Sequence, residues 1–133
     1  MSARRATYLD SSALVKLAVQ EPESSALRRY LARRRLVISS ALARTEVARA
    51  LLPSGADALR RGQDVLASVE LVRINDRVLS AAGAMPPPDL RSLDAIHLAS
   101  AELLGSDLGS FVTYDTRLAS AATARGLRVV QPG

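Results

Sequence analysis

Four acidic residues of this chain lie beside apolar or small residues, where a charge is costly unless something compensates it. They are Asp10, Glu46, Asp94 and Asp115. Two of them follow apolar runs that are typical of strands, at residues 6–9 and 111–114, and the other two lie within helix-like stretches. Clustered carboxylates repel one another, and a cation among them removes that repulsion. The four acids therefore indicate a divalent metal ion and hydrolytic chemistry.

The available ligands restrict the kind of metal. The chain has no cysteine and His97 is its only imidazole, so an oxygen-rich site for Mg²⁺ or Mn²⁺ is favoured over zinc. Such an ion can activate water, orient a phosphodiester and stabilise the leaving oxygen without any protein nucleophile. The residues alone thus predict metal-dependent hydrolysis of a phosphoester.

Each acid also has a structural explanation. Asp10 and Asp115 precede polar residues in the sequence context of a helix N-cap. Glu46 can pair with Arg49 on an exposed helix face, and Asp94 falls in a first helical turn, where the helix dipole favours an acid. Any one acid can be explained in this way, but the set of four is much harder to explain so.

Composition indicates one soluble domain spanning residues 1–133. A chain of 133 residues that is 48% hydrophobic can bury a core, here mainly of Leu, Val and Ala. The lack of cysteine excludes disulfides, thiolate nucleophiles and cysteine zinc sites, and fits a reducing compartment. No apolar run approaches the ~20 residues of a membrane span, and residues 1–5 do not resemble a signal peptide. We predict a cytoplasmic protein without a membrane partner.

The positive charge is concentrated in arginine. The net charge is +5 and Lys16 is the only lysine, so an anionic partner is plausible. Five arginines fall within residues 28–35, and Arg60 and Arg61 form a second group. The first group is either a solvated helix face or a surface for nucleic acid or a partner.

Apolar runs and capping residues predict strands that alternate with helices. Strands are expected around residue 9 and at residues 36–39, 71–74, 110–113 and 127–130; helices are expected at 11–19, 22–35, 40–52, 56–68 and 76–85, from 90 onward, and at 116–124. Five short strands in this order predict a parallel α/β sheet covered on both faces. Ligands of such sheets bind beyond the carboxyl ends of the strands, where Asp10 and Asp115 fall.

Taken in order, the segments around the acids resemble the PIN domains, especially the toxin ribonucleases of VapBC toxin–antitoxin pairs. The resemblance covers essentially the whole chain, and the ordered set of four acidic segments is what makes it specific. The similar segments are residues 8–17, 40–51, 93–101 and 111–118, with a closing strand at 126–132.

The resemblance implies a PIN-like three-layer sandwich around a central, mostly parallel sheet. It further implies a Mg²⁺-dependent endoribonuclease that cleaves RNA, forms a homodimer and is neutralised by a VapB-type antitoxin. Carried over, Asp10 and Asp94 hold the metal, Asp115 completes the site directly or through water, and Glu46 ligates the metal or orients the attacking water. Two neighbours support these acids, Thr113 behind the ligands and Ser12 in the turn beside Asp10.

Two residues near the third acid have open roles. His97 lies three residues after Asp94 on a neighbouring helix face, where a lone histidine is more often packed than catalytic. Arg91, three residues before Asp94, either contacts a phosphate or solvates the start of the helix. Residues 85–89 are rich in proline and depart from the family pattern, and residues 53–71 carry no recognisable segment. The choice of RNA therefore stays open.

Other metal-dependent α/β classes fail on their own motifs. A response-regulator receiver needs adjacent acids after the first strand and a lysine after the last, but no lysine follows Lys16. A haloacid-dehalogenase phosphatase needs Asp-x-Asp, and residue 12 is Ser. The remaining alternative is a catalytically weak module that binds RNA or protein on the same scaffold. Metal-dependent RNA cleavage separates this alternative from the nuclease.

Overall fold

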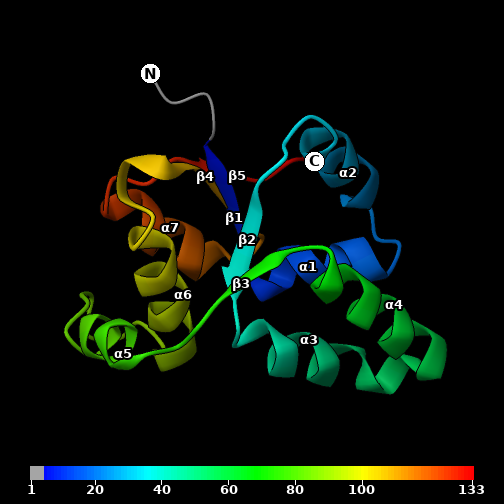
Figure 1. The fold of residues 1–133 in the computed structure, drawn as a ribbon, viewed down its shortest axis with the longest axis horizontal. Helices are drawn as coiled ribbons and strands as arrows, with labels where there is room; N and C mark the ends of the chain where they lie inside the picture. Colours follow the sequence, from blue (N-terminus) through cyan, green and yellow to red (C-terminus); the bar gives the residue numbers. More distant parts are fainter. Residues whose placement is uncertain (1–4) are drawn as a thin grey trace.

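A five-stranded parallel sheet forms the centre of the computed structural model, which describes residues 5–133 (Figure 1). The strands lie in the order β3-β2-β1-β4-β5, and each neighbouring pair is parallel. They are β1 (Ala6–Leu9), β2 (Val37–Ser40), β3 (Glu70–Val72), β4 (Leu108–Val112) and β5 (Val129–Val130). The predicted fold class is confirmed, with a sheet that is wholly parallel.

In the described residues 5–133, seven α-helices cover the two faces of the sheet (Figure 1). One face carries α1 (Ser11–Ala18), α2 (Ser24–Leu31), α3 (Ala43–Leu51) and α4 (Ala56–Ala67); the other carries α5 (Asp76–Gly83), α6 (Ser92–Glu102) and α7 (Thr116–Ala124). Short 3₁₀ turns occupy η1 (Leu52–Ser54) and η2 (Gly105–Asp107). Of the helices in residues 5–133, none has the length and hydrophobicity needed to cross a bilayer. The prediction about a signal peptide concerns residues 1–5, and residues 1–4 lie outside the described part.

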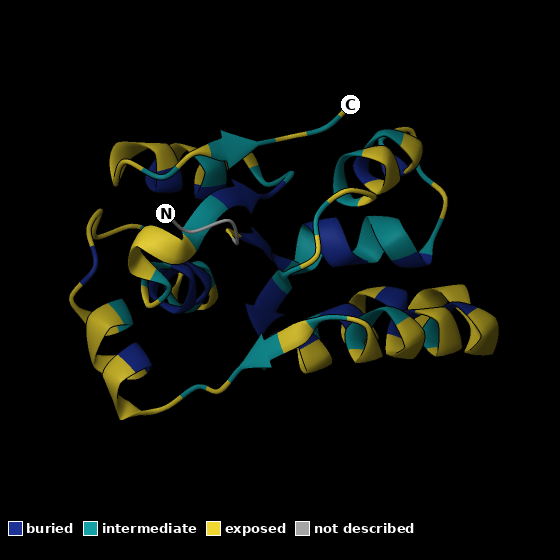
Figure 2. Cartoon of the chain, turned by 45° about the horizontal axis from the view of Figure 1, so that its top comes forward, coloured by how far each residue is buried: buried dark blue, intermediate teal, exposed yellow. Residues whose placement is uncertain are grey.

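Side chains of the central strands alternate between two hydrophobic cores. Tyr8 and Phe111 pack in the core beneath α5, α6 and α7, while Leu9 and Val112 pack in the core beneath the other four helices. The rings of Tyr8 and Phe111 stack with their centroids 5.2 Å apart. Burial on both faces explains why these strands are continuous apolar runs (Figure 2).

The end of α2 differs from the sequence prediction. A helix was expected to extend through residues 33–35, but α2 ends at Leu31 and the arginines follow it. The guanidinium of Arg34 donates to the carbonyl oxygen of Tyr30 at 2.5 Å, which satisfies a carbonyl left open at the helix end. Ser40, whose residue type suits a cap for the helix expected at residues 40–52, instead ends β2 and accepts the N–H of Leu42. Other element ends differ from the prediction by a residue or two.

Glycine at position 109 allows β1 and β4 to lie close together. The register of these strands shifts between Ala6 and Thr7, which pair with Leu108 and Ser110, so Gly109 is the extra residue of a bulge. A Cβ atom at Gly109 would lie 2.9 Å from the Cβ of Arg5 and 3.2 Å from the carbonyl oxygen of Ala6. The bulge therefore requires glycine for steric reasons.

We expect Gly109→Ala to destabilise the protein by about 1–3 kcal/mol, because the new methyl group must displace a neighbouring strand. Gly83→Ala serves as the control, since its Cβ would meet nothing within 4 Å, and it should change stability by less than about 1 kcal/mol. Urea denaturation of both variants measures the difference. If both variants change the free energy of unfolding equally, the contact of Gly109 with Arg5 and Ala6 is not the cause of the destabilisation.

Candidate active site

The four predicted acids line one cavity of about 430 Å³ at the carboxyl ends of β1 and β4. Asp10 follows β1, Asp115 precedes α7, Glu46 lies on α3 and Asp94 lies on α6. Four segments that are distant in the sequence thus bring their carboxylates to one end of the sheet, as expected for the ligand side of a parallel sheet.

Asp10 is the most deeply buried of these acids, at 4% exposure. Its Oδ1 accepts hydrogen bonds from the Ser12 hydroxyl at 2.6 Å and the Ala13 N–H at 3.1 Å, and its Oδ2 accepts one from the Thr113 hydroxyl at 2.6 Å. Burial raises the pKa of Asp10 in spite of these three bonds. The bond from Ala13 makes Asp10 the N-cap of α1, as its sequence context indicated, and neither Ser11 nor Ser12, whose residue types also suit a cap, serves as one.

Ser12 and Thr113 also join the loops that carry the acids. The Ser12 hydroxyl accepts the N–H of Tyr114 at 3.0 Å, and the Thr113 hydroxyl accepts the N–H of Asp115 at 3.0 Å. Each hydroxyl therefore donates to Asp10 and accepts from the segment after β4. These contacts hold the first and fourth acids in a fixed relation, although they lie 105 positions apart in the sequence.

Arg91 connects the other two aspartates. Its Nε lies 3.2 Å from Asp94 Oδ2 and its Nη2 lies 2.9 Å from Asp115 Oδ2. Asp115 Oδ1 accepts the N–H groups of Arg117 and Leu118, which makes Asp115 the N-cap of α7. Burial raises the pKa of Asp94, and this effect exceeds the opposite effect of Arg91. Arg91 itself is 60% exposed, so the pair has a counter-ion at the surface of the site.

Glu46 belongs to a second hydrogen-bonded group that includes His97 and Tyr8. Glu46 Oε1 accepts from the Ser11 hydroxyl at 2.5 Å and lies 2.7 Å from His97 Nε2. The other ring nitrogen, Nδ1, lies 2.8 Å from the Tyr8 hydroxyl. With a proton on Nε2 the imidazole donates to Glu46, and Nδ1 then accepts from the Tyr8 hydroxyl. Burial opposes the charge of Glu46, but the bonds from His97 and Ser11 outweigh it and lower the pKa of Glu46.

Two features of this group were not predicted. The pairing of Glu46 with Arg49 does not occur, and Glu46 contacts His97 instead. His97 is packed as expected, at 2% exposure, yet it also contacts a candidate site acid. Tyr8 was missed altogether, since nothing in its local sequence indicates a contact with a residue 89 positions away. Lys16 pairs with Glu21 and Glu23 outside the cavity.

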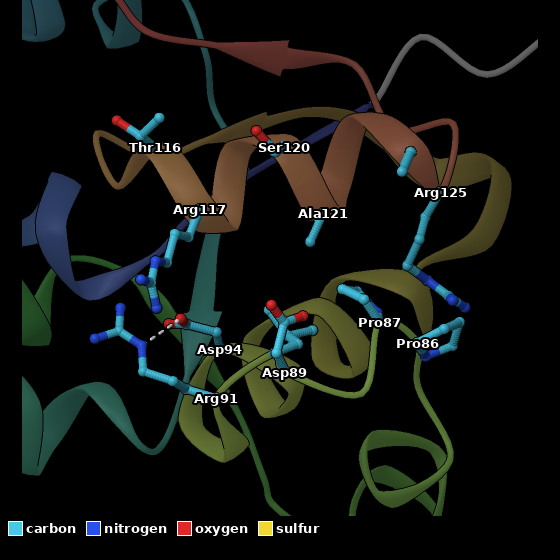
Figure 3. A pocket seen from close by; sticks show the side chains of 12 residues that line it. Pro86, Pro87, Asp89, Arg91, Asp94, Thr116, Arg117, Ser120, Ala121 and Arg125 are labelled. Atoms are coloured by element: carbon cyan, nitrogen blue, oxygen red, sulfur yellow. Dashed lines mark hydrogen bonds and ion pairs between the residues drawn. The ribbon is translucent and has the colours of Figure 1, made fainter.

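A larger cavity of about 800 Å³ adjoins the acids and shares Arg91 and Asp94 with them (Figure 3). It lies between the segment that leads into α6 and the side of α7. Figure 3 shows Arg91 and Arg117 reaching toward Asp94 at one end of this cavity, with prolines at the other. Its remaining labelled lining residues are Pro86, Pro87, Asp89, Thr116, Ser120, Ala121 and Arg125. The proline-rich segment of the sequence thus forms a wall beside the candidate site.

The chemistry of the donors suits a hard divalent cation. The acids offer carboxylate oxygens only, and the buried, pKa-raised Asp10 lacks a cationic partner of its own. Within residues 5–133 no three acidic or histidine side chains already form a ready-made metal-binding group. The guanidinium of Arg91 lies between Asp94 and Asp115 and compensates the charge that a cation would otherwise neutralise. The donor set therefore fits Mg²⁺ if Arg91 moves aside.

Comparison with known proteins places this geometry in a family. The PIN domain model matches residues 7–124. Ribonuclease VapC46 of Mycobacterium tuberculosis (strain ATCC 25618 / H37Rv) is 57% identical over 127 residues, which cover 96% of this chain and 98% of that protein. Ribonuclease VapC35 of Mycobacterium tuberculosis (strain CDC 1551 / Oshkosh) is 46% identical over 130 residues, covering 95% and 96%.

Solved structures agree on the fold. Mycobacterium tuberculosis VapC20, a sarcin–ricin loop cleaving toxin, superimposes with a TM-score of 0.76 at 16% identity and covers 95% of this chain and 99% of that one. A chain of a toxin–antitoxin complex from Klebsiella pneumoniae gives a TM-score of 0.72 at 20% identity, covering 96% and 98%. Over nearly its whole length, therefore, the chain belongs to the PIN domain family and, within it, to the VapC ribonucleases.

Proposed function

We propose that this protein is a Mg²⁺-dependent endoribonuclease toxin that cleaves cellular RNA by attack of a metal-activated water on a phosphodiester. The observation that carries the proposal is the convergence of Asp10, Glu46, Asp94 and Asp115 on one cavity. The buried, hydrogen-bonded state of Asp10 supports it, because a fold rarely retains a costly buried charge without a use for it. Membership of the VapC ribonucleases supports the choice of RNA.

Asp10, Asp94 and Asp115 are the proposed metal ligands. Asp10 is held by three hydrogen bonds, which leaves acceptor capacity on its carboxylate for one further partner. Asp94 and Asp115 each contribute an oxygen that now accepts from Arg91. When bound, Mg²⁺ would polarise the phosphate and lower the pKa of a water molecule. Mn²⁺ could serve as a substitute.

Glu46 is proposed to orient the attacking water, or to ligate the metal. Its lowered pKa keeps it ionised at neutral pH, so it accepts hydrogen bonds and does not donate them. Both of its hydrogen bonds are made by Oε1, which leaves Oε2 to accept from water. His97 and Tyr8 are positioning residues in this scheme, since they fix the carboxylate through the imidazole ring.

The larger adjoining cavity is the proposed path of the RNA next to the cut. Arg91 and Arg117 line it together with Asp94, so phosphates of the bound strand can lie within reach of two guanidinium groups. The apolar wall formed by Pro86, Pro87 and Ala121 suits packing against a nucleobase. These residues are where we expect the choice among RNA sequences to be made.

A VapB-type antitoxin is the proposed regulatory partner, and a homodimer is the proposed assembly. The fold neighbours include chains from toxin–antitoxin complexes, which supports a protein inhibitor of this kind. Because the proposed substrate is cellular RNA, we propose that the reaction takes place in the cytoplasm. None of these roles involves a membrane.

We expect the purified protein to cut total bacterial RNA into discrete fragments in Mg²⁺ and to leave it intact in EDTA. Asp94→Asn should abolish cutting while keeping the fold, because it removes a proposed metal ligand. End mapping of the fragments then gives the cleavage positions. If the wild-type protein binds RNA but never cuts it with metal present, the catalytically weak binding module becomes the better description.

We expect Asp10→Asn to raise Tm in EDTA by about 3–6 °C, the shift that ~1 kcal/mol produces in a domain of this size. Burial raises the pKa of Asp10, so its ionised form costs the metal-free fold free energy at neutral pH, and the amide removes that cost. The difference in Tm between Asp10→Asn and the wild type should become smaller as the pH falls, since the wild-type carboxyl then binds a proton. Added Mg²⁺ should raise Tm of the wild type but not of Asp10→Asn.

Asp64→Asn, on the exposed face of α4, is the matched control for this experiment and should melt like the wild type under both conditions. A lower Tm for Asp10→Asn than for the wild type in EDTA would show that the hydrogen bonds of Asp10 outweigh the cost of its charge.

We expect Arg91→Ala to shift the Mg²⁺ dependence of Tm to concentrations lower by roughly fivefold or more. The reason is that metal and guanidinium compete for the oxygens of Asp94 and Asp115. Arg117→Ala removes an equal charge from the same region but leaves these ion pairs intact, and it serves as the control. Equal shifts in both variants would mean that net charge, and not competition, sets the affinity for metal.

A further inference from the structure

A second charged cavity lies at the opposite end of the sheet, near the start of β1 and β4. It has a volume of about 590 Å³ and contains five arginines from three separate parts of the chain. These residues are Arg5, Arg33, Arg34, Arg35 and Arg128. Its floor includes Thr7 of β1 and Ser110 of β4. We call it the arginine cavity.

Among residues 5–133, no acidic side chain forms an ion pair with an arginine of this cavity. The ion pairs found among residues 5–133 engage Lys16, Arg60, Arg91, Arg125 and His97, and none of the five arginines. Residues 1–4 contain no acid. Five guanidinium groups gathered in this way repel one another, so their arrangement favours an external anion.

One of the five arginines is fixed in place before any ligand binds. The guanidinium of Arg34 lies 3.5 Å from the centroid of the Tyr30 ring and donates to the Tyr30 carbonyl oxygen. The Tyr30 hydroxyl in turn donates to Ser110 Oγ at 2.9 Å, which anchors the ring to β4. A guanidinium stacked on an aromatic ring loses little freedom when it binds a phosphate.

The arginines of residues 28–35 lie in two different environments. Arg28 is on the exposed side of α2 and donates to Gln20, as a solvated helix face would. Residues 33–35 come after the helix and join Arg5 and Arg128, which are far from them in the sequence. The group is therefore divided: residues 33–35 line the arginine cavity, whereas Arg28 and Arg29 do not.

We propose that the arginine cavity is a second RNA site, which binds backbone phosphates at a distance from the cut. The inference rests on the proposed function, because it assumes that the chain's substrate is RNA. An extended polyanion suits this site better than a compact anion does, since the five charges come from separate segments around a cavity much larger than one phosphate.

A path for such an RNA runs along the edge strand β5 and the side of α7. Arg128 immediately precedes β5, whose Val129 helps to line a shallow hollow of about 630 Å³ together with Thr116 and Ser120. The same two α7 residues line the large cavity beside Asp94. Along β1 the two ends of the sheet are only ~10 Å apart, at about 3.3 Å per residue from Thr7 to Asp10. The surface route over α7 and β5 is longer than this rise of the buried strand, so an RNA well beyond about five nucleotides in length is needed to contact both sites at once.

The test measures RNA binding in the Asp10→Asn background, so that no RNA is cut. The test variant adds the substitutions Arg33→Ala, Arg35→Ala and Arg128→Ala, and the control adds Arg49→Ala, Arg73→Ala and Arg77→Ala, which remove three exposed arginines that line neither cavity. Binding of an RNA of about 5 and one of about 30 nucleotides is measured by fluorescence anisotropy against salt. Thermal unfolding verifies that each variant is folded.

For the long RNA, the slope of log K against log salt should become shallower by about 2 in the test variant, because each phosphate that a removed arginine had neutralised accounts for about 0.7 of the slope. The control should change by less than half as much, and neither variant should change the slope for the short RNA. Equal slopes for both variants, or an equal loss of affinity for short and long RNA, would overturn the second site. Tighter binding of polyglutamate than of RNA would assign the cavity to an acidic protein instead.

The experiments distinguish a failure of the proposed nuclease activity from a failure of the second RNA site. Wild-type protein that never cuts RNA but loses long-RNA binding on removal of these arginines would overturn the nuclease and support the second site. Cleavage of long RNA by the wild type, with salt slopes that the arginine substitutions leave unchanged, would support the nuclease and overturn the second site.

Discussion

The charge of Asp10 is buried, and the surrounding structure is arranged to compensate it. Burial raises the pKa of this carboxyl, so the fold supplies two hydroxyl donors and one backbone N–H. The hydroxyls belong to Ser12 and Thr113, and each accepts a hydrogen bond from the loop that carries Asp115. The need to satisfy one carboxylate thus determines how the segments after β1 and β4 lie together. The same requirement affects the shape of the cavity that these segments line.

Structural and chemical roles coincide in two of the acids. Asp10 Oδ1 caps α1 and Asp115 Oδ1 caps α7, and in both residues the other oxygen is directed to a different partner. A helix cap fixes the rotamer of an aspartate, and a fixed rotamer is what a metal ligand requires. The capping explanation and the ligand explanation of these residues are therefore compatible. An acidic N-cap at the carboxyl end of a parallel strand can be a simple way to orient a ligand.

Sequence patterns predicted the parts of the structure that local rules determine. Helix α7 begins and ends where Asp115 and Gly126 indicate, because an N-cap and a glycine with positive φ are local signals. The four acids were found because each stands out from its apolar neighbours. The contact of Tyr8 with His97 spans 89 positions, and that of Arg91 with Asp115 spans 24. Such contacts depend on how the helices pack on the sheet, which no local spacing encodes.

The arginine cavity illustrates the same limit. The cluster at residues 33–35 was visible in the sequence, but arginines from two other segments join it only because neighbouring parallel strands begin at the same end of the sheet.

Arg91 explains how the acidic end of the sheet remains folded without metal. Asp94 and Asp115 repel each other across the cavity, and the guanidinium between them partly offsets that repulsion. Arg91 is largely exposed and also lines the larger cavity, so it would still belong to that cavity if a cation displaced it. Under the proposed function, the displaced guanidinium would then face the RNA backbone. Metal binding and phosphate binding would be coupled through one side chain.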